Sequence, residues 1–277
     1  MKTAFTILPE RTGNEPLHLL LELGNYGISF LWFTKDPAVV KGIAVYNFSE
    51  NSLPQSMADK IEDVLKANTI FSEMNATVTI CYDLKESLLV PETYYQHETA
   101  EAMLNLVHAT EVDCNYKTEP VKDKPVYNLY AVHKKTEAVL SAHFPTATVH
   151  HATSLQLEKL NPNGSVIHCI FFHNSIKVFL FRDSALQLVQ QFSYTIPVDA
   201  AYHLLNCCRQ YDVNPSEVTL LLSGMIDEQS KLYTELYRYF LNIEFDSTDE
   251  GIGLDDNIRS YPAHFFSHLT GFISCVS

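Results

Sequence analysis

The sequence predicts an α/β protein that contains two copies of a β-β-β-α-β unit. The first observation is an order of elements that occurs twice, about 150 residues apart: three apolar runs, an amphipathic helix and a fourth apolar run. The second is composition, because 46% of the 277 residues are hydrophobic and 19% are charged, which favours a packed core over disorder. A chain of this length accommodates one large domain or two of ordinary size.

The first copy is expected between residues 17 and 81. Apolar and β-branched runs predict its four strands, at Leu17–Leu23, Ile28–Phe33, Gly42–Phe48 and Ala76–Cys81. A helix is expected over Pro54–Ala67, because apolar residues recur there at helical spacing. The segment ELGNYG, residues 22–27, supplies the turn between the first two strands.

The second copy is expected between residues 166 and 222. The same criteria predict its four strands, at Val166–Phe172, Ile176–Phe181, Leu186–Phe192 and Glu217–Leu222. Its helix is predicted over Asp199–Gln210, which begins just after a proline and carries apolar residues at helical spacing. The repeat is one of pattern, since the two copies share little sequence identity.

Further α/β elements lie between and after the copies. We expect an extended run, two strands and four helices, at Ser87–Tyr95, Asn128–Val132, Ala147–His151, Glu98–His108, Lys134–Ala142, Glu228–Leu241 and Pro262–Val276. The turn-rich stretch Leu160–Gly164 is the expected boundary. It divides the chain into a first lobe, residues 1–160, with an inserted α/β segment, and a second lobe, residues 161–277, whose C-terminal helix is expected to pack back on the first.

Charge and cysteine usage exclude several classes of protein. The formal net charge of -14 repels phosphate backbones, so we expect no nucleic-acid partner. No apolar stretch reaches the roughly 18 residues of a membrane span, so no membrane insertion is expected, and no signal peptide is evident. The six cysteines form no C-x-x-C pair and several lie in apolar runs, as buried free thiols do. The cytoplasm is the expected compartment.

One segment has the composition of a phosphate-binding turn. In ELGNYG, an acid is followed by closely spaced glycines, at Glu22, Gly24, Asn25 and Gly27. Glycine allows backbone N–H groups to approach a phosphate, although Asn and Gly are equally the expected residues of a plain hairpin.

Two β-β-β-α-β units in one chain resemble the actin-like superfamily, which includes sugar kinases, actin and heat-shock chaperones. The resemblance implies ribonuclease H-like lobes around a central cleft. The segment SLLVPETYYQHETAEAMLNL, residues 87–106, is similar to an uncharacterised bacterial family with an actin-like ATPase fold. That family resembles the cytoplasmic assembly-platform proteins of type IV pili and type II secretion.

The resemblance implies an ATP site built from three motifs, and this chain departs from each. The first hairpin has Glu22 where the superfamily usually has Asp, with Gly24 retained. The hairpin that opens the second half has neither an acid nor a glycine, because its turn is His173-Asn174. In the adenosine-side motif, a Gly-Gly pair after a strand, the segment LLLSGM has Ser223 and Gly224 in place but Met225 instead of the second glycine. Ser223 and Gly224 therefore fit either this motif or a structural helix entry. ELGNYG is therefore expected to be a former phosphate hairpin that now serves as a turn.

Other clusters are weighed as sites and as ordinary structure. His264 and His268 are four residues apart on the expected terminal helix and could share a face. His150 and His151 are neighbours on a strand, so their side chains point to opposite faces. Cys207 and Cys208 are expected to be buried. The loop Asp246–Asn257 only partly matches a calcium loop. No metal site is expected. Aromatic residues crowd two segments and fit either a core rim or a protein contact surface, at Tyr233, Tyr237, Tyr239, Phe240, Phe265, Phe266 and Phe272.

The sequence leaves three functions open. The first is a scaffold or binding protein that does not hydrolyse ATP and that acts with a protein partner or as a homodimer. The second is a nucleotide-dependent kinase or phosphatase of the same superfamily, for which Asp83 is the best-placed acid. The third is a sensor of a small ligand. ATP is the one cofactor that the resemblance suggests, and the departures from its motifs argue against it.

Overall fold

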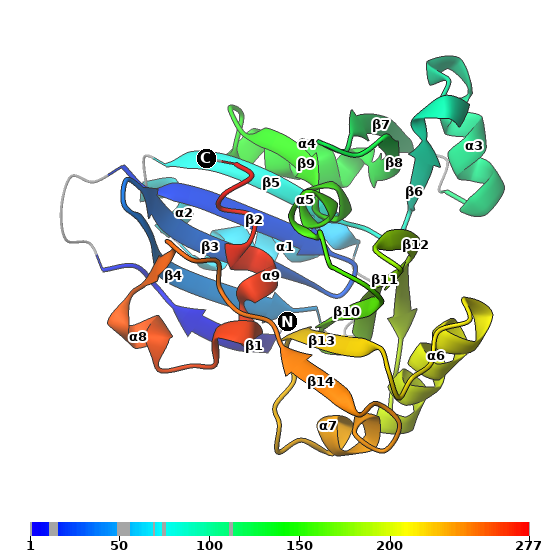
Figure 1. Cartoon of the computed structure of the whole chain (residues 1–277). Coiled ribbons are helices and arrows are strands. Elements are labelled where there is room, and N and C mark those ends of the chain that lie inside the picture. The colour runs from blue at the N-terminus through cyan, green and yellow to red at the C-terminus, as the bar shows by residue number, and fades with distance from the viewer. Residues whose placement is uncertain are drawn as a thin grey trace. The chain divides into compact units, whose positions relative to one another are not determined.

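The computed structural model describes residues 2–10, 16–48, 56–68, 70–73, 76–110 and 113–276. The chain forms two compact units (Figure 1). Unit 1 consists of Met1–Lys159, Gly251–Ile258 and Phe272–Ser277, and unit 2 consists of Leu160–Glu250 and Arg259–Gly271. Among the described residues, no helix has the length and apolar character needed to cross a membrane.

The main sheet of unit 1 has the strand order β1-β4-β3-β2-β5-β9, with β15 beside β4. Its strands are β1 (Lys2–Ile7), β2 (His18–Gly24), β3 (Gly27–Lys35), β4 (Ala38–Asn47), β5 (Thr77–Asp83), β9 (Thr148–His151) and β15 (Gly253–Leu254). The strands β1, β4, β3 and β2 are antiparallel neighbours, whereas β5 and β9 join parallel to β2. A parallel neighbour requires a crossover, and helix α1 (Met57–Ala67) lies in the chain between β4 and β5.

Two helices cover one face of this sheet. Helix α1 begins at a capping box, in which Asp59 N donates to Ser56 Oγ at 3.2 Å and Ser56 N donates to Asp59 Oδ2 at 3.1 Å. Helix α4 (Lys134–His143) packs beside it, and the apolar faces of both helices join the core of unit 1. The chain's single tryptophan, Trp32, is buried in this core and stacks on Phe71. Helices α2 (Ile70–Glu73) and α5 (Ala152–Lys159) also belong to unit 1, and α5 contacts β5 and β9.

A smaller sheet is inserted between β5 and β9. Its order is β6-β8-β7, formed by β6 (Ser87–Pro91), β7 (Cys114–Pro120) and β8 (Val126–His133). Helix α3 (Ala100–Val107) packs on it, and Leu104 is buried there against Leu129 and Ala131. Two short 3₁₀ turns, η1 (Glu92–Tyr94) and η2 (His97–Thr99), lead into α3. The insertion therefore has a small core of its own.

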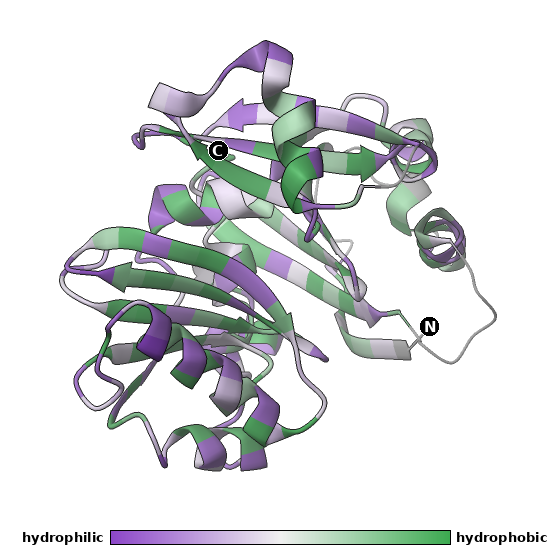
Figure 2. Cartoon of the chain, turned by 90° about the vertical axis from the view of Figure 1, so that its right-hand side faces the viewer, coloured by the Kyte–Doolittle hydropathy of each residue, from purple (hydrophilic) through white to green (hydrophobic). Residues whose placement is uncertain are grey.

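Unit 2 is built on a sheet of order β12-β11-β10-β13-β14. Its strands are β10 (Val166–Phe171), β11 (Ser175–Arg182), β12 (Ala185–Ser193), β13 (Thr219–Gly224) and β14 (Asn242–Phe245). Helix α6 (Pro197–Gln210) covers one face, and α7 (Lys231–Leu236) packs beside it. The strands carry long apolar stretches (Figure 2). Cys207 and Cys208 are buried free thiols, as expected, and burial raises the pKa of Cys207 to about 11.

The duplicated β-β-β-α-β unit is confirmed by the pairing. The strand order β4-β3-β2-β5-β9 of unit 1 has the same connectivity as β12-β11-β10-β13-β14 of unit 2. In both units the first strand of the hairpin pairs parallel with the strand after the helix. This pairing places Gly24 opposite Asp83 in unit 1 and Phe171 opposite Gly224 in unit 2.

Two predicted helices are wrong in extent. The helix expected over Glu228–Leu241 is limited to α7, and Phe240 reaches the core from the turn that follows this helix. The long C-terminal helix is replaced by η3 (Ala263–Phe265) and α9 (Ser267–Thr270), after the short helix α8 (Asp256–Arg259). Phe266, Leu269 and Phe272 are buried there, so their helix-like spacing reflects packing of an irregular segment.

An ion pair ties the inserted sheet to the main sheet and makes the stability of unit 1 depend on pH. His150 Nδ1 lies 3.5 Å from Glu119 Oε2, while His151, on the opposite face of β9, donates its backbone N–H to Glu119 Oε1 at 2.8 Å. The hydrogen bond to Glu119 raises the pKa of His150 and outweighs burial, which lowers it. Burial by itself would raise the pKa of Glu119, but hydrogen bonds from His150, Ser154 and the His151 backbone leave that pKa lowered.

The free energy of unfolding should therefore lose the His150 contribution as the pH rises. Because the pKa of His150 is raised in the folded state, its charge stabilises fully below the ordinary value of about 6.5 and ceases to do so above the folded pKa. His150→Gln should remove this dependence, which begins near pH 6.5 and ends above the raised pKa of the folded state. The change should be less than about 1 kcal/mol, since the imidazole is 39% exposed. Urea unfolding followed by Trp32 fluorescence measures it.

His143→Gln is the matched control. His143 is exposed on α4, and the described residues offer it no carboxylate partner. If His150→Gln and His143→Gln show the same pH profile as the original protein, the His150–Glu119 pair does not contribute to stability.

Candidate functional site

The first predicted turn lies at the carboxyl edge of the parallel strands in unit 1. Asn25 and Tyr26 connect β2 to β3, and Asn25 Oδ1 accepts a hydrogen bond from Lys85 N at 3.0 Å. Glu22 and Asp83 are both buried. Because Leu21 and Leu23 face the core under α1, alternation along the strands puts both carboxyl groups on the opposite face of the sheet. Four of the predicted site residues and the candidate acid thus lie near one strand edge.

The glycines of this turn serve different purposes. A Cβ on Gly27 would lie 2.7 Å from Tyr46 O, so Gly27 is needed for the close approach of β4. A Cβ on Gly24 would meet nothing nearer than Asp83 O at 3.7 Å. Neither glycine has the left-handed φ that only glycine adopts easily. Packing of the hairpin therefore explains Gly27 and leaves Gly24 without a structural requirement.

The corresponding turn of unit 2 is closed by its own hydrogen bonds. Phe172 N donates to Ser175 O at 2.8 Å, and Tyr194 donates from its hydroxyl to Phe172 O at 3.2 Å and from its backbone N–H to Asn174 O at 3.0 Å. The turn carries the side chains of Phe172, His173 and Asn174 and no glycine. Close approach of backbone N–H groups to a phosphate is therefore obstructed at this turn.

Ser223 and Gly224 are used by the internal packing of unit 2. Gly224 has φ +81°, and a Cβ there would lie 2.3 Å from Phe171 O, which accepts a hydrogen bond from Met225 N at 2.8 Å. Ser223 is fully buried, and its Oγ lies 2.6 Å from Ser267 Oγ. Both predicted residues are thus accounted for by structure.

A buried histidine and aspartate in unit 2 were not predicted as a pair. His168 is buried in β10, and its Nε2 lies 3.6 Å from Asp246 Oδ2. Burial acts to raise the pKa of Asp246, but the nearby His168 imidazole and Ser267 outweigh this and leave the pKa lowered. Asp246, the first position of the partial calcium loop, thus lies beside His168 at ion-pair distance.

No predicted histidine pair forms a metal site. His264 Nε2 donates to Ile226 O at 2.8 Å and its ring stacks on Phe245. His264 lies in η3 and His268 in α9, so they do not share one helix face as expected. Within the described residues, no group of three or more His, Cys, Asp or Glu side chains is placed to hold a metal ion.

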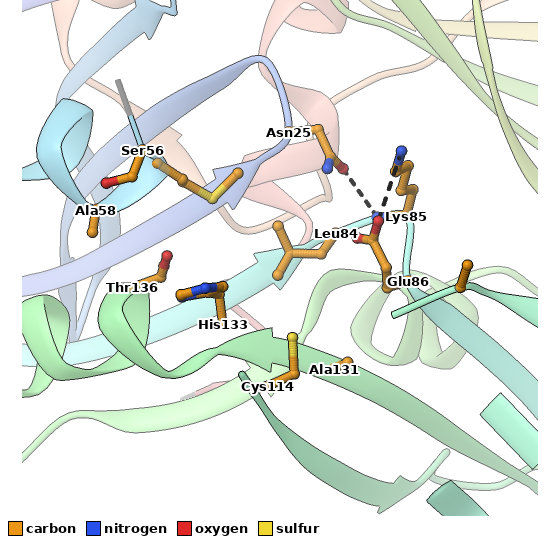
Figure 3. Close-up of a pocket in the computed structure, with 12 residues that line it drawn as sticks. Asn25, Ser56, Ala58, Leu84, Lys85, Glu86, Cys114, Ala131, His133 and Thr136 are labelled. Atoms are coloured by element: carbon orange, nitrogen blue, oxygen red, sulfur yellow. Dashed lines mark hydrogen bonds and ion pairs between the residues drawn. The ribbon is translucent and has the colours of Figure 1, made fainter. Parts of the chain in front are cut away.

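A pocket of about 380 Å³ opens in unit 1 (Figure 3). Its lining comes from separate segments of the chain: Asn25, Ser56, Met57, Ala58, Leu84, Lys85, Glu86, Ala109, Cys114, Ala131, His133 and Thr136. Of these, the sequence analysis singled out Asn25 alone. For the residues at the starts of α1 and α4, the signal in the sequence is a helix N-cap after a strand, at Ser56 and at His133.

The topology explains why two helices begin at this pocket. β4 runs parallel to β2, since each is antiparallel to β3, so α1 starts at the edge where β2 ends. α4 leads back into β9, which is parallel to β5, and it therefore starts at the same edge. His133 caps α4, with Nδ1 accepting a hydrogen bond from Lys135 N at 3.2 Å.

Alanine at Gly224 should be much more destabilising than alanine at Gly164. Both glycines have φ near +80°, so both substitutions introduce backbone strain of about 1 kcal/mol. Only at Gly224 does the new Cβ collide with backbone, whereas nothing lies within 4 Å at Gly164. Gly224→Ala should therefore lower the free energy of unfolding by about 2 kcal/mol more than Gly164→Ala. Urea unfolding by far-UV circular dichroism measures both, and equal losses would contradict the assigned packing.

Comparison with known proteins is consistent with this arrangement. The family described as "Protein of unknown function (DUF3822)" matches residues 11–243. A search of curated protein sequences gave no match. The chain is similar to a solved structure from Bacteroides thetaiotaomicron VPI-5482, described as a protein with actin-like ATPase fold and unknown function. The two are 17% identical, with 97% of this chain and 99% of that chain covered and a TM-score of 0.76.

Two further solved structures are similar over nearly their whole length. One is the PilM-PilN type IV pilus biogenesis complex, at 12% identity, with 93% of this chain and 98% of that chain covered and a TM-score of 0.63. The other is the ethanolamine utilization protein EutJ from Carboxydothermus hydrogenoformans, at 10% identity, with 96% and 92% covered and a TM-score of 0.50. Such identities establish the fold alone. The actin-like ATPase fold is thereby confirmed, and the chain belongs to the DUF3822 family.

Proposed function

We propose that this protein is an actin-like scaffold or binding protein that does not turn over ATP. The observation that carries the proposal is the turn Phe172–Asn174, which contains no glycine and is closed by hydrogen bonds to Ser175 and Tyr194. Glycine is the residue that lets backbone N–H groups approach a phosphate without a Cβ in the way. The second lobe therefore lacks the glycine turn that the superfamily resemblance implies for its phosphate hairpin.

The remaining motif residues support the same proposal. Gly224 is required by its contact with Phe171, and Ser223 is bonded to Ser267, so neither is available to define an adenosine pocket. In unit 1, Gly27 is explained by the approach of β4. The hairpin that the sequence marked as a former phosphate turn is a well-formed structural hairpin.

A protein is the partner that we propose, and the cytoplasm is the proposed compartment. PilM, which shares the fold at a TM-score of 0.63, is found in complex with PilN. Part of the predicted aromatic surface lies in the core, because Phe240, Phe266 and Phe272 are buried. Tyr237 and Leu241 are 58% and 63% exposed, so their side chains are available for contact with a protein partner. The net charge of -14 disfavours nucleic acid as the partner.

A nucleotide-dependent enzyme is the second candidate. It is favoured by Asp83, which is buried at the end of β5 and lies opposite Gly24 in the sheet. A carboxylate beside a glycine with free space around it suits a metal ion and its bound waters. At the other acidic position, Glu22 has a longer side chain than the Asp that is usual in the superfamily. This candidate requires nucleotide binding, which the proposed scaffold does not.

Titration with nucleotides separates the two candidates. ATP, ADP and GTP, each with and without magnesium, should leave the melting temperature unchanged at millimolar concentration, and no phosphate should be released from ATP. Saturation to 100 times Kd would instead add about 2.7 kcal/mol, a shift of a few degrees. A shift that Glu22→Gln abolishes, while the exposed-site control Glu92→Gln retains it, would overturn the proposal in favour of the enzyme.

A further inference from the structure

We propose that strand β12 is a dimerisation edge, at which it pairs antiparallel with β12 of a second copy of this chain about a two-fold axis. The inference goes beyond the proposed function, because such pairing requires neither ATP turnover nor its absence. β12 is the outermost strand on one side of the sheet of unit 2 (Figure 1). A strand in this position presents a row of backbone N–H and C=O groups to a further strand.

The register of β12 on β11 identifies the backbone groups that face the open edge. Tyr194 N donates at 3.0 Å to the turn before β11, and successive residues of a strand face opposite ways. Val189 and Gln191 therefore direct their N–H and C=O groups away from β11, and no other described residue bonds to these groups. His203 Nε2 lies 3.2 Å from Ser193 O, so a side chain of α6 closes this end of the edge.

β12 lacks the features that normally keep edge strands from pairing. Charged side chains, proline and short length protect an edge, whereas the sequence of β12, ALQLVQQFS, contains no charge and no proline. After a bulge, Leu188–Ser193 pairs with β11 without interruption. Each of the other outer strands that the structure describes has such a feature: β1 (Lys2), β6 (Pro91), β7 (Lys117 and Glu119), β9 (four residues), β14 (Glu244) and β15 (two residues).

β12 is also incompletely buried for a strand of this composition. Seven of the eight residues of its neighbour β11 are buried, whereas no residue of β12 is. Leu188 and Phe192 pack on the core of unit 2 and remain half-buried. Ile196 follows the strand closely and is 51% exposed. A further strand beside β12 would remove part of this apolar surface from water, which stabilises the pairing.

Self-complementarity favours a second copy of β12 as the partner. Antiparallel pairing about Gln190 sets Val189 of one copy opposite Gln191 of the other, so the outward-facing backbone groups meet. The same register sets Leu188 opposite Phe192 twice and Gln190 opposite its own counterpart, and such apolar and amide pairs stabilise neighbouring strands. No charges meet along the strand, although the whole chain carries a net charge of -14. A strongly basic or acidic partner would find no complementary charge on β12.

Sedimentation-velocity ultracentrifugation of the full chain tests for the dimer, at protein concentrations up to about 100 μM. We expect a monomer–dimer equilibrium that shifts toward the dimer as sodium chloride is added, because salt screens the repulsion between two chains of net charge -14. A chain that stays monomeric at every concentration and salt overturns the proposal, and would leave the edge to an extended segment of another protein.

Charge variants at Gln190 test the position of the two-fold axis. Gln190 is exposed, so Gln190→Lys and Gln190→Glu should both fold, which far-UV circular dichroism verifies. Each variant sets like charges opposite each other and should weaken self-association by about fivefold, whereas a mixture of the two should dimerise because Lys meets Glu. Gln229→Lys, at an exposed glutamine before α7, is the matched control and should dimerise like the original protein. A dimer that Gln190→Lys retains, or a mixture that does not dimerise, overturns the proposal.

Discussion

The parallel pairing of β2 with β5 and of β10 with β13 is the constraint on which the rest of the structure depends. Parallel neighbours cannot be joined by a tight turn, so each pair requires a crossover, which contains α1 in unit 1 and α6 in unit 2. The same pairing aligns the carboxyl ends of the strands. Hairpin turns, strand-end acids and helix starts must consequently meet at one edge of each sheet, whatever residues occupy them.

The two units use this shared edge in different ways. At corresponding register positions, unit 1 has Gly24 beside Asp83, and unit 2 has Phe171 beside Gly224. Space remains around Gly24, whereas Gly224 is in close contact with the Phe171 backbone. The first edge has kept an open backbone, and the second has been filled by packing. The two copies of the same strand arrangement thus differ in how closely the residues at equivalent positions are packed.

The sequence predicted the strands of both copies because their apolar runs are long and their turns are marked. It missed β7, whose sequence CNYKTEP is polar, and α5, which is buried on most sides and so lacks a one-sided apolar stripe. The predicted lengths of the helices at α7 and at the C-terminal segment were wrong. Aromatic residues there have helical spacing, but they lie in turns and are buried from those turns in the core. Among the site residues, those of the hairpin followed from motif spacing. The pocket did not, because its walls come from segments that only the tertiary fold brings together.

The connection from β5 to the inserted sheet has almost no freedom of its own. It consists of Leu84, Lys85 and Glu86, and each is held by a different part of unit 1. His151 Nε2 donates to Leu84 O at 3.2 Å, Lys85 N donates to Asn25, and Ala131 N donates to Glu86 O at 3.1 Å. Rotation of the insertion about this connection would break at least one of these bonds. The hairpin turn between β2 and β3 is therefore joined to the inserted sheet through Lys85, and a displacement of the insertion about this connection would have to move that turn or break its hydrogen bond.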